Sequence, residues 1–329
     1  MRSLLFFLLA LGLFQGCSSK QYYTPEESSL FGIEKPIITT PSYITSINAN
    51  GATTRDNRII NNFGISEFTL PDGFVYLNNS TNGILSANKT GDINIGETNT
   101  TINFSSNVIA ASIENNLLAL VFSDNSFGVY DINESKFKLK EYGANSFIND
   151  TRIASPVILN KIILFPTLDG KIAIVDKENF KVSRTLMIDT QNDIKNVILL
   201  KTLGDTLIAA TGNKIVSLNK GKYTTKDMII ANYFVKDQFV YLALLDGTVM
   251  KLDFDLNILG SKKFKFAKFH AISLDKDDNI YLIETQGYIL SMNNNFENVK
   301  VYNFPFYDDE KVFVSGDKIY FDNKLLKLN

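Results

Sequence analysis

The residue types that most often carry out catalysis are scarce in this sequence. It contains one histidine, His270, and no tryptophan. A histidine-based triad, or a zinc site with its full ligand set, would depend on that single imidazole. Because His270 follows Phe269 at the start of a strand-like run, we expect it to pack or to form a hydrogen bond. No pattern pairs two carboxylates for glycoside hydrolysis, and the sequence predicts no catalytic residue.

One acidic segment has part of the spacing of a calcium loop. Asp275, Asp277 and Asn279 place side-chain oxygens at its first, third and fifth positions. Ile280 stands where the loop needs Gly, and Gln286 where it needs a bidentate Glu. Asp and Asn are also common in ordinary turns, which is the reading we prefer. A quinone cofactor would need an aromatic platform and a bound cation, so we expect no cofactor and no metal.

The only cysteine, Cys17, follows a short apolar leader. Arg2 supplies a positive charge, and residues 4–14 form an apolar run. This run is too short to span a bilayer core of about 30 Å as a helix. An ordinary secretory signal with an unrelated cysteine is one interpretation. It would leave a stray thiol in a secreted chain that has no disulfide partner for it.

The residues around Cys17 offer a second interpretation. With Gly16 before the cysteine and Ser18 after it, the segment resembles the lipobox of bacterial lipoproteins. The resemblance implies a signal peptide over residues 1–16, a palmitate-bearing lipidated Cys17 and sorting to the outer membrane. Residues 17–45 contain prolines among Ser, Thr, Tyr and Glu, which predicts a flexible tether before a domain over residues 46–329.

Two segments fit the acidic-x-Asn-x-Ser/Thr acceptor pattern of bacterial N-glycosylation. They are residues 97–101 and 131–135, with Asn99 and Asn133 as candidate acceptors. Both are expected in or beside loops of outer strands, where a glycan would be solvated. A chain rich in Asn also produces such matches by chance.

The charge balance excludes one class of partner. Without residues 1–16 the chain has 32 basic and 35 acidic side chains, a net charge of −3. Nucleic-acid binding requires clustered Lys and Arg, so no nucleic acid is expected. The densest basic stretch, residues 262–268, alternates in a way that places its lysines on the solvated side of an outer strand.

A tight turn between two apolar runs recurs seven times. The turn pairs are Asn82-Gly83, Asp124-Asn125, Asp169-Gly170, Gly212-Asn213, Asp246-Gly247, Gln286-Gly287 and Asp322-Asn323. Their steps of 42, 45, 43, 34, 40 and 36 residues are typical of β-propeller blades. The fifth copy is the clearest, with strand-like runs at residues 228–235, 238–244, 248–253 and 258–266. The recurrence favours a propeller over a β-sandwich, which has no such repeated unit.

The last copy has only three strand-like runs before the chain ends. We predict that the N-terminal segment supplies the fourth strand, for example residues 55–61, and thereby closes the ring. An eighth blade would need further strands from residues 36–64, which is short for that purpose. The sequence therefore predicts an all-β propeller of seven four-stranded blades, with eight left open.

The run LDGKIAIVD, at residues 168–176, resembles the repeats of quinoprotein-like (PQQ-like) propellers. Among lipoproteins the chain is similar to the BamB-like family of outer-membrane barrel assembly. This resemblance implies a lipid-anchored periplasmic scaffold whose partners are envelope proteins, including the barrel assembly machinery.

Three functions stay open at this point. The first is the non-catalytic scaffold for protein–protein interaction, facing the periplasm. The second is a propeller enzyme, a lyase or hydrolase, with a site in the central channel. The third is a surface-exposed lipoprotein that binds ligands. An apolar patch on one loop face would favour the scaffold, and converging charged residues in the channel would favour the enzyme.

Overall fold

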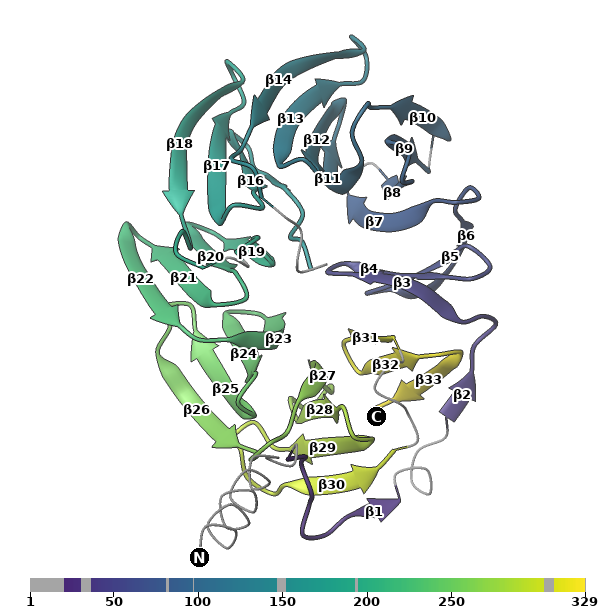
Figure 1. Cartoon of the computed structure of the whole chain (residues 1–329), viewed down its shortest axis with the longest axis vertical. Helices are drawn as coiled ribbons and strands as arrows, with labels where there is room; N and C mark the ends of the chain where they lie inside the picture. Colours follow the sequence, from purple (N-terminus) through teal and green to yellow (C-terminus); the bar gives the residue numbers. More distant parts are fainter. Residues whose placement is uncertain are drawn as a thin grey trace, which may run out of the picture.

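The eight sheets of this chain stand around a ring (Figure 1). The computed structural model describes residues 21–30, 37–80, 83–96, 98–146, 152–192, 195–304 and 311–328. Within these ranges every regular element is a β-strand. Seven sheets have four strands and one has five, and successive strands of each blade pair antiparallel. The predicted all-β propeller is confirmed.

Each blade is numbered in chain order, and its strands run from the innermost to the outermost. Blades 1 to 4 comprise β3 (Ile44–Asn48), β4 (Gly51–Thr54), β5 (Arg58–Asn61), β6 (Gly64–Thr69); β7 (Val75–Ser80), β8 (Gly83–Ala87), β9 (Asp92–Ile95), β10 (Thr100–Asn103); β11 (Val108–Glu114), β12 (Leu117–Phe122), β13 (Ser126–Asp131), β14 (Lys136–Tyr142); and β15 (Val157–Ile158), β16 (Ile162–Pro166), β17 (Lys171–Asp176), β18 (Lys181–Met187). Blades 5 to 7 comprise β19 (Leu199–Leu203), β20 (Thr206–Ala210), β21 (Lys214–Asn219), β22 (Lys222–Asp227); β23 (Ile230–Lys236), β24 (Phe239–Leu244), β25 (Thr248–Asp253), β26 (Ile258–Lys263); and β27 (Phe269–Leu274), β28 (Ile280–Glu284), β29 (Tyr288–Met292), β30 (Lys300–Asn303). Blade 8 comprises β31 (Val312–Ser315), β32 (Lys318–Phe321), β33 (Lys324–Lys327) and, from the N-terminal segment, β2 (Ile37–Thr39).

The antiparallel order gives the ring two distinct faces. The turns between first and second strands and between third and fourth strands lie at one end of every blade, which we call the hairpin face. In blade 6 these turns are residues 237–238 and 254–257. The turns between second and third strands and the links to the next blade lie at the other end, the connection face. In blade 6 these are residues 245–247 and 264–268.

Six of the seven predicted turn pairs join second and third strands on the connection face, as the repeat requires. The pair at 82–83 does not, because Gly83 begins β8, the second strand of blade 2, and residue 82 lies outside the described residues. The true counterpart in blade 2 is Thr90-Gly91, and blade 1 has its own, Asp56-Asn57. Asn57 and Gly91 both have positive φ angles, 62° and 93°, as tight turns demand.

The preferred count of seven blades is wrong, and the alternative of eight is found. We expected residues 36–64 to be too short for an eighth blade, but strands of four to six residues form a blade over residues 44–69. The segment 55–61 therefore contributes β5 to blade 1 and does not close the ring. Closure by an N-terminal strand is confirmed, and β2 performs it by pairing antiparallel with β33.

One hydrogen bond recurs in each blade and shows that β2 is a true fourth strand. The residue that follows the outermost strand donates its backbone N–H to the carbonyl of the last residue of the turn between second and third strands. Phe104 donates to Gly91 over 2.8 Å, for example, and Phe264 to Gly247 over 2.9 Å. In blade 8 the donor is Thr40, directly after β2, and the Asn323 carbonyl accepts over 2.7 Å.

The core lies between the blades. Outer strands such as β18 and β26 are mostly exposed, whereas central strands such as β12 are almost wholly buried. Each of eight clusters of buried side chains joins two neighbouring blades. The cluster between blades 1 and 8 has five buried residues, and the cluster between blades 1 and 2 has three. Each of the other clusters has at least nine. Apolar packing therefore holds blade 1 least firmly.

Polar side chains add links around the ring. A buried or half-buried Asn or Ser on one blade donates to a backbone carbonyl of its neighbour or of the segment leading into it. The pairs are Asn48 with Tyr76, Asn78 with Ala111, Ser112 with Pro156, Asn196 with Arg152, Ser217 with Phe254, Asn232 with His270, and Ser273 with Gly316. In a chain without tryptophan, these bonds and the apolar clusters together set the packing of the blades.

Candidate functional site

The N-terminal segment forms a strap over the outer edge of blades 6 and 7. Its short strand β1 (Ser29–Leu30) pairs parallel with the end of β30 and makes blade 7 five-stranded. Further back, the ring of Tyr23 packs edge-on against Phe264 at 6.3 Å and against Tyr288 at 5.9 Å between centroids. Burial raises the pKa of Tyr23 to about 12, with smaller contributions from Glu284 and Tyr288. Parts of the predicted tether thus lie on the propeller, and β3 starts at residue 44, two residues before the predicted domain boundary.

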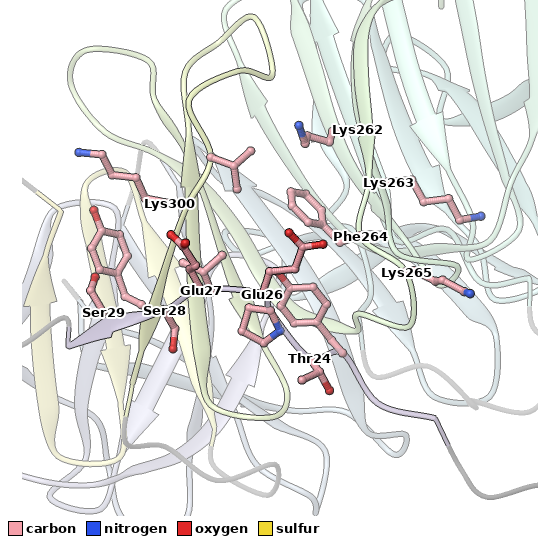
Figure 2. Close-up of a pocket in the computed structure, with 15 residues that line it drawn as sticks. Thr24, Glu26, Glu27, Ser28, Ser29, Lys262, Lys263, Phe264, Lys265 and Lys300 are labelled. Carbon is pink, nitrogen blue, oxygen red and sulfur yellow. The ribbon is translucent and has the colours of Figure 1, made fainter.

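The strap covers a groove of about 860 Å³. In Figure 2, Glu26 and Glu27 of the strap lie in the middle, with Lys300 on one side and the lysines of residues 262–265 on the other. Lys263 pairs with Asp246 over 2.6 Å. The basic stretch is exposed at the end of an outer strand as predicted, but the sequence did not reveal that the strap and Lys300 come next to it.

A second groove opens on the hairpin face, between blades 5 and 6. Its volume is about 520 Å³. The exposed fractions of Leu203 and Leu259 in its lining are 54% and 52%. The lining also contains Phe239 and Phe254 and six polar or charged residues, among them Lys220 of blade 5 and Asp255 of blade 6. Exposed apolar side chains next to polar and charged ones on a loop face are suited to protein binding.

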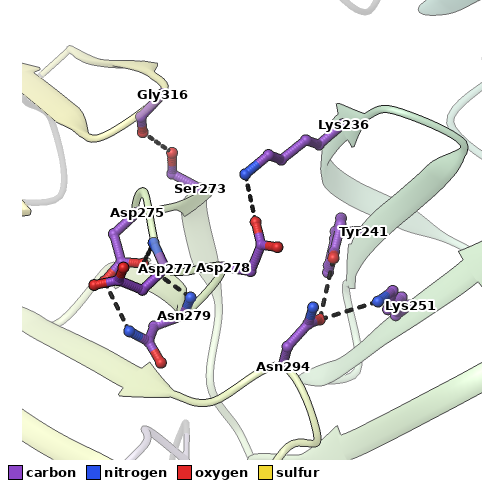
Figure 3. Close-up of polar contacts among 10 residues, drawn as sticks. All are labelled: Lys236, Tyr241, Lys251, Ser273, Asp275, Asp277, Asp278, Asn279, Asn294 and Gly316. Carbon is purple, nitrogen blue, oxygen red and sulfur yellow. Dashed lines mark hydrogen bonds and ion pairs between the residues drawn. The ribbon is translucent and has the colours of Figure 1, made fainter.

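Behind the blade 6 side of this groove, polar contacts of Lys251 and Tyr241 with Asn294 link blade 6 to blade 7 (Figure 3). The Nζ atom of Lys251 lies 4.0 Å from the ring centroid of Phe239, which lines the groove, and donates to Asn294 of blade 7 over 3.2 Å. Tyr241 donates to the same Asn294 oxygen over 3.1 Å. Burial raises the pKa of Tyr241 to about 12, although the hydrogen bond to Asn294 opposes the shift. These contacts fix the wall of the groove to the neighbouring blade.

The calcium-like segment is a turn, as we preferred. The Asp275 carboxylate accepts the backbone N–H groups of Asp277 and Asn279, each over 2.9 Å, and the side-chain amide of Asn279 (Figure 3). Asp278 pairs with Lys236 of blade 6. Among the described residues, no group of three His, Cys, Asp or Glu side chains could hold a metal ion.

His270 lies half-buried in β27, the innermost strand of blade 7, and its carbonyl accepts a hydrogen bond from Asn232. The inner side of the ring carries further contacts of this polar kind. Asn50 donates to the Ser155 hydroxyl over 2.8 Å, and Arg152 donates to the Ala231 carbonyl over 2.6 Å. The segment that leads into blade 4 is therefore bonded to blades 1 and 6 across the ring.

The three predicted modification residues have different positions. Cys17 lies outside the described residues. Asn99 and Asn133 are both exposed and lie in turns between third and fourth strands, so both are on the hairpin face. The acidic residue before Asn99, at position 97, is outside the described residues, and Asp131 before Asn133 is buried and accepts the N–H of Glu134 over 3.1 Å. No helix in the described part of the chain has the length and apolar character needed to cross a membrane.

Sequence comparison relates the whole chain to one kind of characterised protein. It is 26% identical to the plasminogen-binding protein PgbB of two Helicobacter pylori strains, J99 and 26695, over 384 aligned positions. The alignments cover 99% of this chain and 71% and 70% of the two relatives. No protein-family model matches the sequence.

Structural comparison finds other propellers. The crystal structure of BamB from Moraxella catarrhalis has a TM-score of 0.64 at 13% identity, and the match covers 88% of this chain and 98% of BamB. The C-terminal WD40 domain of Sif2 has a TM-score of 0.64 at 11% identity, with 92% and 100% of the two chains covered. The computationally designed Ika8 protein has a TM-score of 0.56 at 12% identity, with 91% and 98% covered. At these identities the similarity is one of fold, and that fold is the β-propeller.

Proposed function

We propose that this chain is a lipid-anchored, protein-binding propeller of the bacterial outer membrane, and that plasminogen is its partner. The observation that carries the partner is the 26% identity to PgbB, which extends over 99% of this chain. The propeller is therefore within the part that the relatives share. On this proposal the protein is displayed on the cell surface, which was the third function left open by the sequence.

The groove on the hairpin face supports this face as the binding surface. Leu203 and Leu259 are more than half exposed there, and burial of apolar surface against a partner is favourable. The contacts of Lys251 and Tyr241 with Asn294 hold the wall of the groove in place. Because this wall is already ordered, less conformational entropy is lost when a partner binds.

The direct test of the partner is plasminogen capture by intact cells, measured by flow cytometry. We expect cells that produce the protein to bind more plasminogen than cells of a deletion strain, and complementation to restore binding. Equal binding by the producing and deletion strains, with equal surface staining of a control lipoprotein, would contradict the proposal.

A second candidate function is a periplasmic scaffold in outer-membrane assembly. The shared propeller fold of BamB favours it, with a TM-score of 0.64. A crosslinked pull-down from intact cells separates the two functions. Recovery of barrel-assembly proteins together with resistance of the protein to external protease would favour the scaffold.

The proposed modifications have separate tests. Lipidation of Cys17 predicts incorporation of labelled palmitate, lost in Cys17→Ser. Glycosylation predicts a mass decrease in Asn99→Gln and in Asn133→Gln when the protein is isolated from its own host. Unchanged masses in both variants would remove the glycan from the proposal.

A further inference from the structure

The chain is fixed to the propeller very close to the proposed anchor. Tyr23, packed between Phe264 and Tyr288, lies six residues after Cys17. Six extended residues span at most about 20 Å. A lipid at Cys17 would therefore keep the edge formed by blades 6 and 7 near the membrane, whatever the path of the residues between.

Two exposed aromatic rings lie at this point of the edge. Tyr22 and Phe266 have exposed fractions of 49% and 41%, and they line a small cavity together with Lys268. Phe266 has a φ of 66°, a backbone conformation that is unfavourable for a bulky residue. The Nζ atom of Lys265 lies 4.8 Å from the Phe266 ring centroid. Aromatic rings flanked by lysines are typical of side chains at a membrane–water interface.

The charge of the edge is also suited to a membrane. Lys262, Lys265 and Lys300 are exposed there. The acidic groups that face them are Glu26 and Glu27 of the strap, while Asp246 pairs with Lys263. The four lysines around the groove therefore exceed the three acidic groups by one, in a chain whose net charge is negative.

We propose that this edge rests on the anionic lipid headgroups of the membrane that holds Cys17. The aromatic rings of Tyr22 and Phe266 enter the interface, and Lys262, Lys265 and Lys300 contact headgroup phosphates. The inference rests on the proposed lipidation for its anchor. Its consequence is a defined orientation: the propeller is held by its rim at blades 6 and 7, and the groove between blades 5 and 6 is left open to a partner.

A vesicle assay can supply the anchor chemically. Because Cys17 is the only cysteine, the chain from Cys17 onward couples at one position to a maleimide lipid. Lysine acetylation is then measured by mass spectrometry on vesicles of phosphatidylcholine with phosphatidylglycerol, and on phosphatidylcholine alone. We expect at least threefold slower acetylation of Lys262, Lys265 and Lys300 on the anionic vesicles only. Lys181 and Lys222, exposed on other blades, should not change.

Equal acetylation rates on the two kinds of vesicle would overturn the membrane-facing edge. The same protection by soluble glycerophosphate at equal phosphate concentration would also overturn it, because the site would then recognise free phosphate. Failure of palmitate labelling in cells would instead overturn the anchor, so the two failures are distinct.

A matched pair of variants tests the charge. For the chain without a lipid, we expect the triple variant Lys262→Gln, Lys265→Gln and Lys300→Gln to lower partition onto anionic vesicles by about a hundredfold, about fivefold for each lysine. The triple control Lys161→Gln, Lys181→Gln and Lys222→Gln changes the net charge equally but lies on blades 4 and 5. Equal losses in the two triple variants would show a general charge effect and contradict the site.

Discussion

At the scale of single residues, buried carboxylates hold the links between blades. Asp189 follows the outermost strand of blade 4, and its carboxylate accepts the side-chain amide of Asn192 over 2.8 Å and the hydroxyl of Thr211 over 3.2 Å. Thr211 belongs to the connection-face turn of blade 5. Burial by itself raises the pKa of Asp189, but the hydrogen bonds from Asn192, Gln191 and Thr211 outweigh it and hold that pKa below the ordinary 3.8.

Asp189→Asn should therefore destabilise the protein in a pH-dependent way. A depressed pKa contributes stability above the ordinary value, and this stability is lost as the pH falls through the folded-state pKa. At pH 7 we expect a loss of about 1–3 kcal/mol in the free energy of unfolding, because the donors of Gln191, Asn192 and Thr211 then face a neutral amide in place of a carboxylate. Urea unfolding at several pH values should show the difference shrinking below pH 3.8. The exposed control Asp205→Asn should change stability by no more than about 0.5 kcal/mol. A difference that stays constant down to pH 2.5 would contradict the assignment.

Glycine at the connection-face turn is required by space as well as by backbone angle. Gly170 has a φ of +80°, and a Cβ atom there would lie 1.8 Å from the Asp189 carbonyl oxygen. Gly221 has nearly the same φ, +79°, but open space around it. We expect Gly221→Ala to cost about 1 kcal/mol and Gly170→Ala about 2–4 kcal/mol. Equal losses in thermal or urea unfolding would mean that the close approach contributes nothing.

At the scale of elements, β2 joins the two ends of the ring. Ile37 pairs with Leu326 and Thr39 with Lys324, and without them β33 would be an open edge strand. A chain that begins at residue 41 should lose about 2–5 kcal/mol, from the missing ladder and the Thr40 bond, and should self-associate in light scattering. A chain that begins at residue 36 keeps β2 and serves as the control. Equal behaviour of the two chains would contradict closure by β2.

The sequence predicted the strands and turns of single blades better than it predicted the number of blades. Alternating apolar runs and turn residues are local signals, so pairs such as Asp169-Gly170 and Asp246-Gly247 marked the blades correctly. Blade 1 was missed because its strands are only four to six residues long and residues 55–61 were assigned to closure of the ring. The identity of the closing strand depends on pairing between Ile37 and Leu326, near opposite ends of the chain, which no local pattern encodes.

The candidate site was less predictable for a related reason. Leu203 and Leu259 belong to different blades, and each looks like an ordinary strand residue in the sequence. Their common position in one groove follows from the packing of blades 5 and 6. The strap is similar: prolines suggested a tether, whereas the packing of Tyr23 against Phe264 and Tyr288 depends on tertiary contacts.

At the scale of the whole molecule, the rim and the hairpin face have different roles in this account. The rim at blades 6 and 7 carries Tyr22, Tyr23 and the lysine-lined groove, near the proposed anchor. The hairpin face carries the apolar groove and both candidate glycan acceptors, Asn99 and Asn133. A tethered propeller arranged in this way presents its hairpin face to partners and keeps its rim at the membrane.

The central claim is that the hairpin-face groove binds a protein partner, and plasminogen affinity tests it most directly. Biolayer interferometry should compare the wild-type chain from residue 18 onward with the double variant Leu203→Glu and Leu259→Glu. The control is Leu245→Glu, which alters a leucine of similar exposure, 51%, on the connection face. We expect the double variant to weaken plasminogen binding by at least about tenfold, because a bound partner would then bury charges in place of apolar side chains, while the control binds as the wild type does. No plasminogen binding by the wild type, or unchanged affinity in the double variant, would contradict the account.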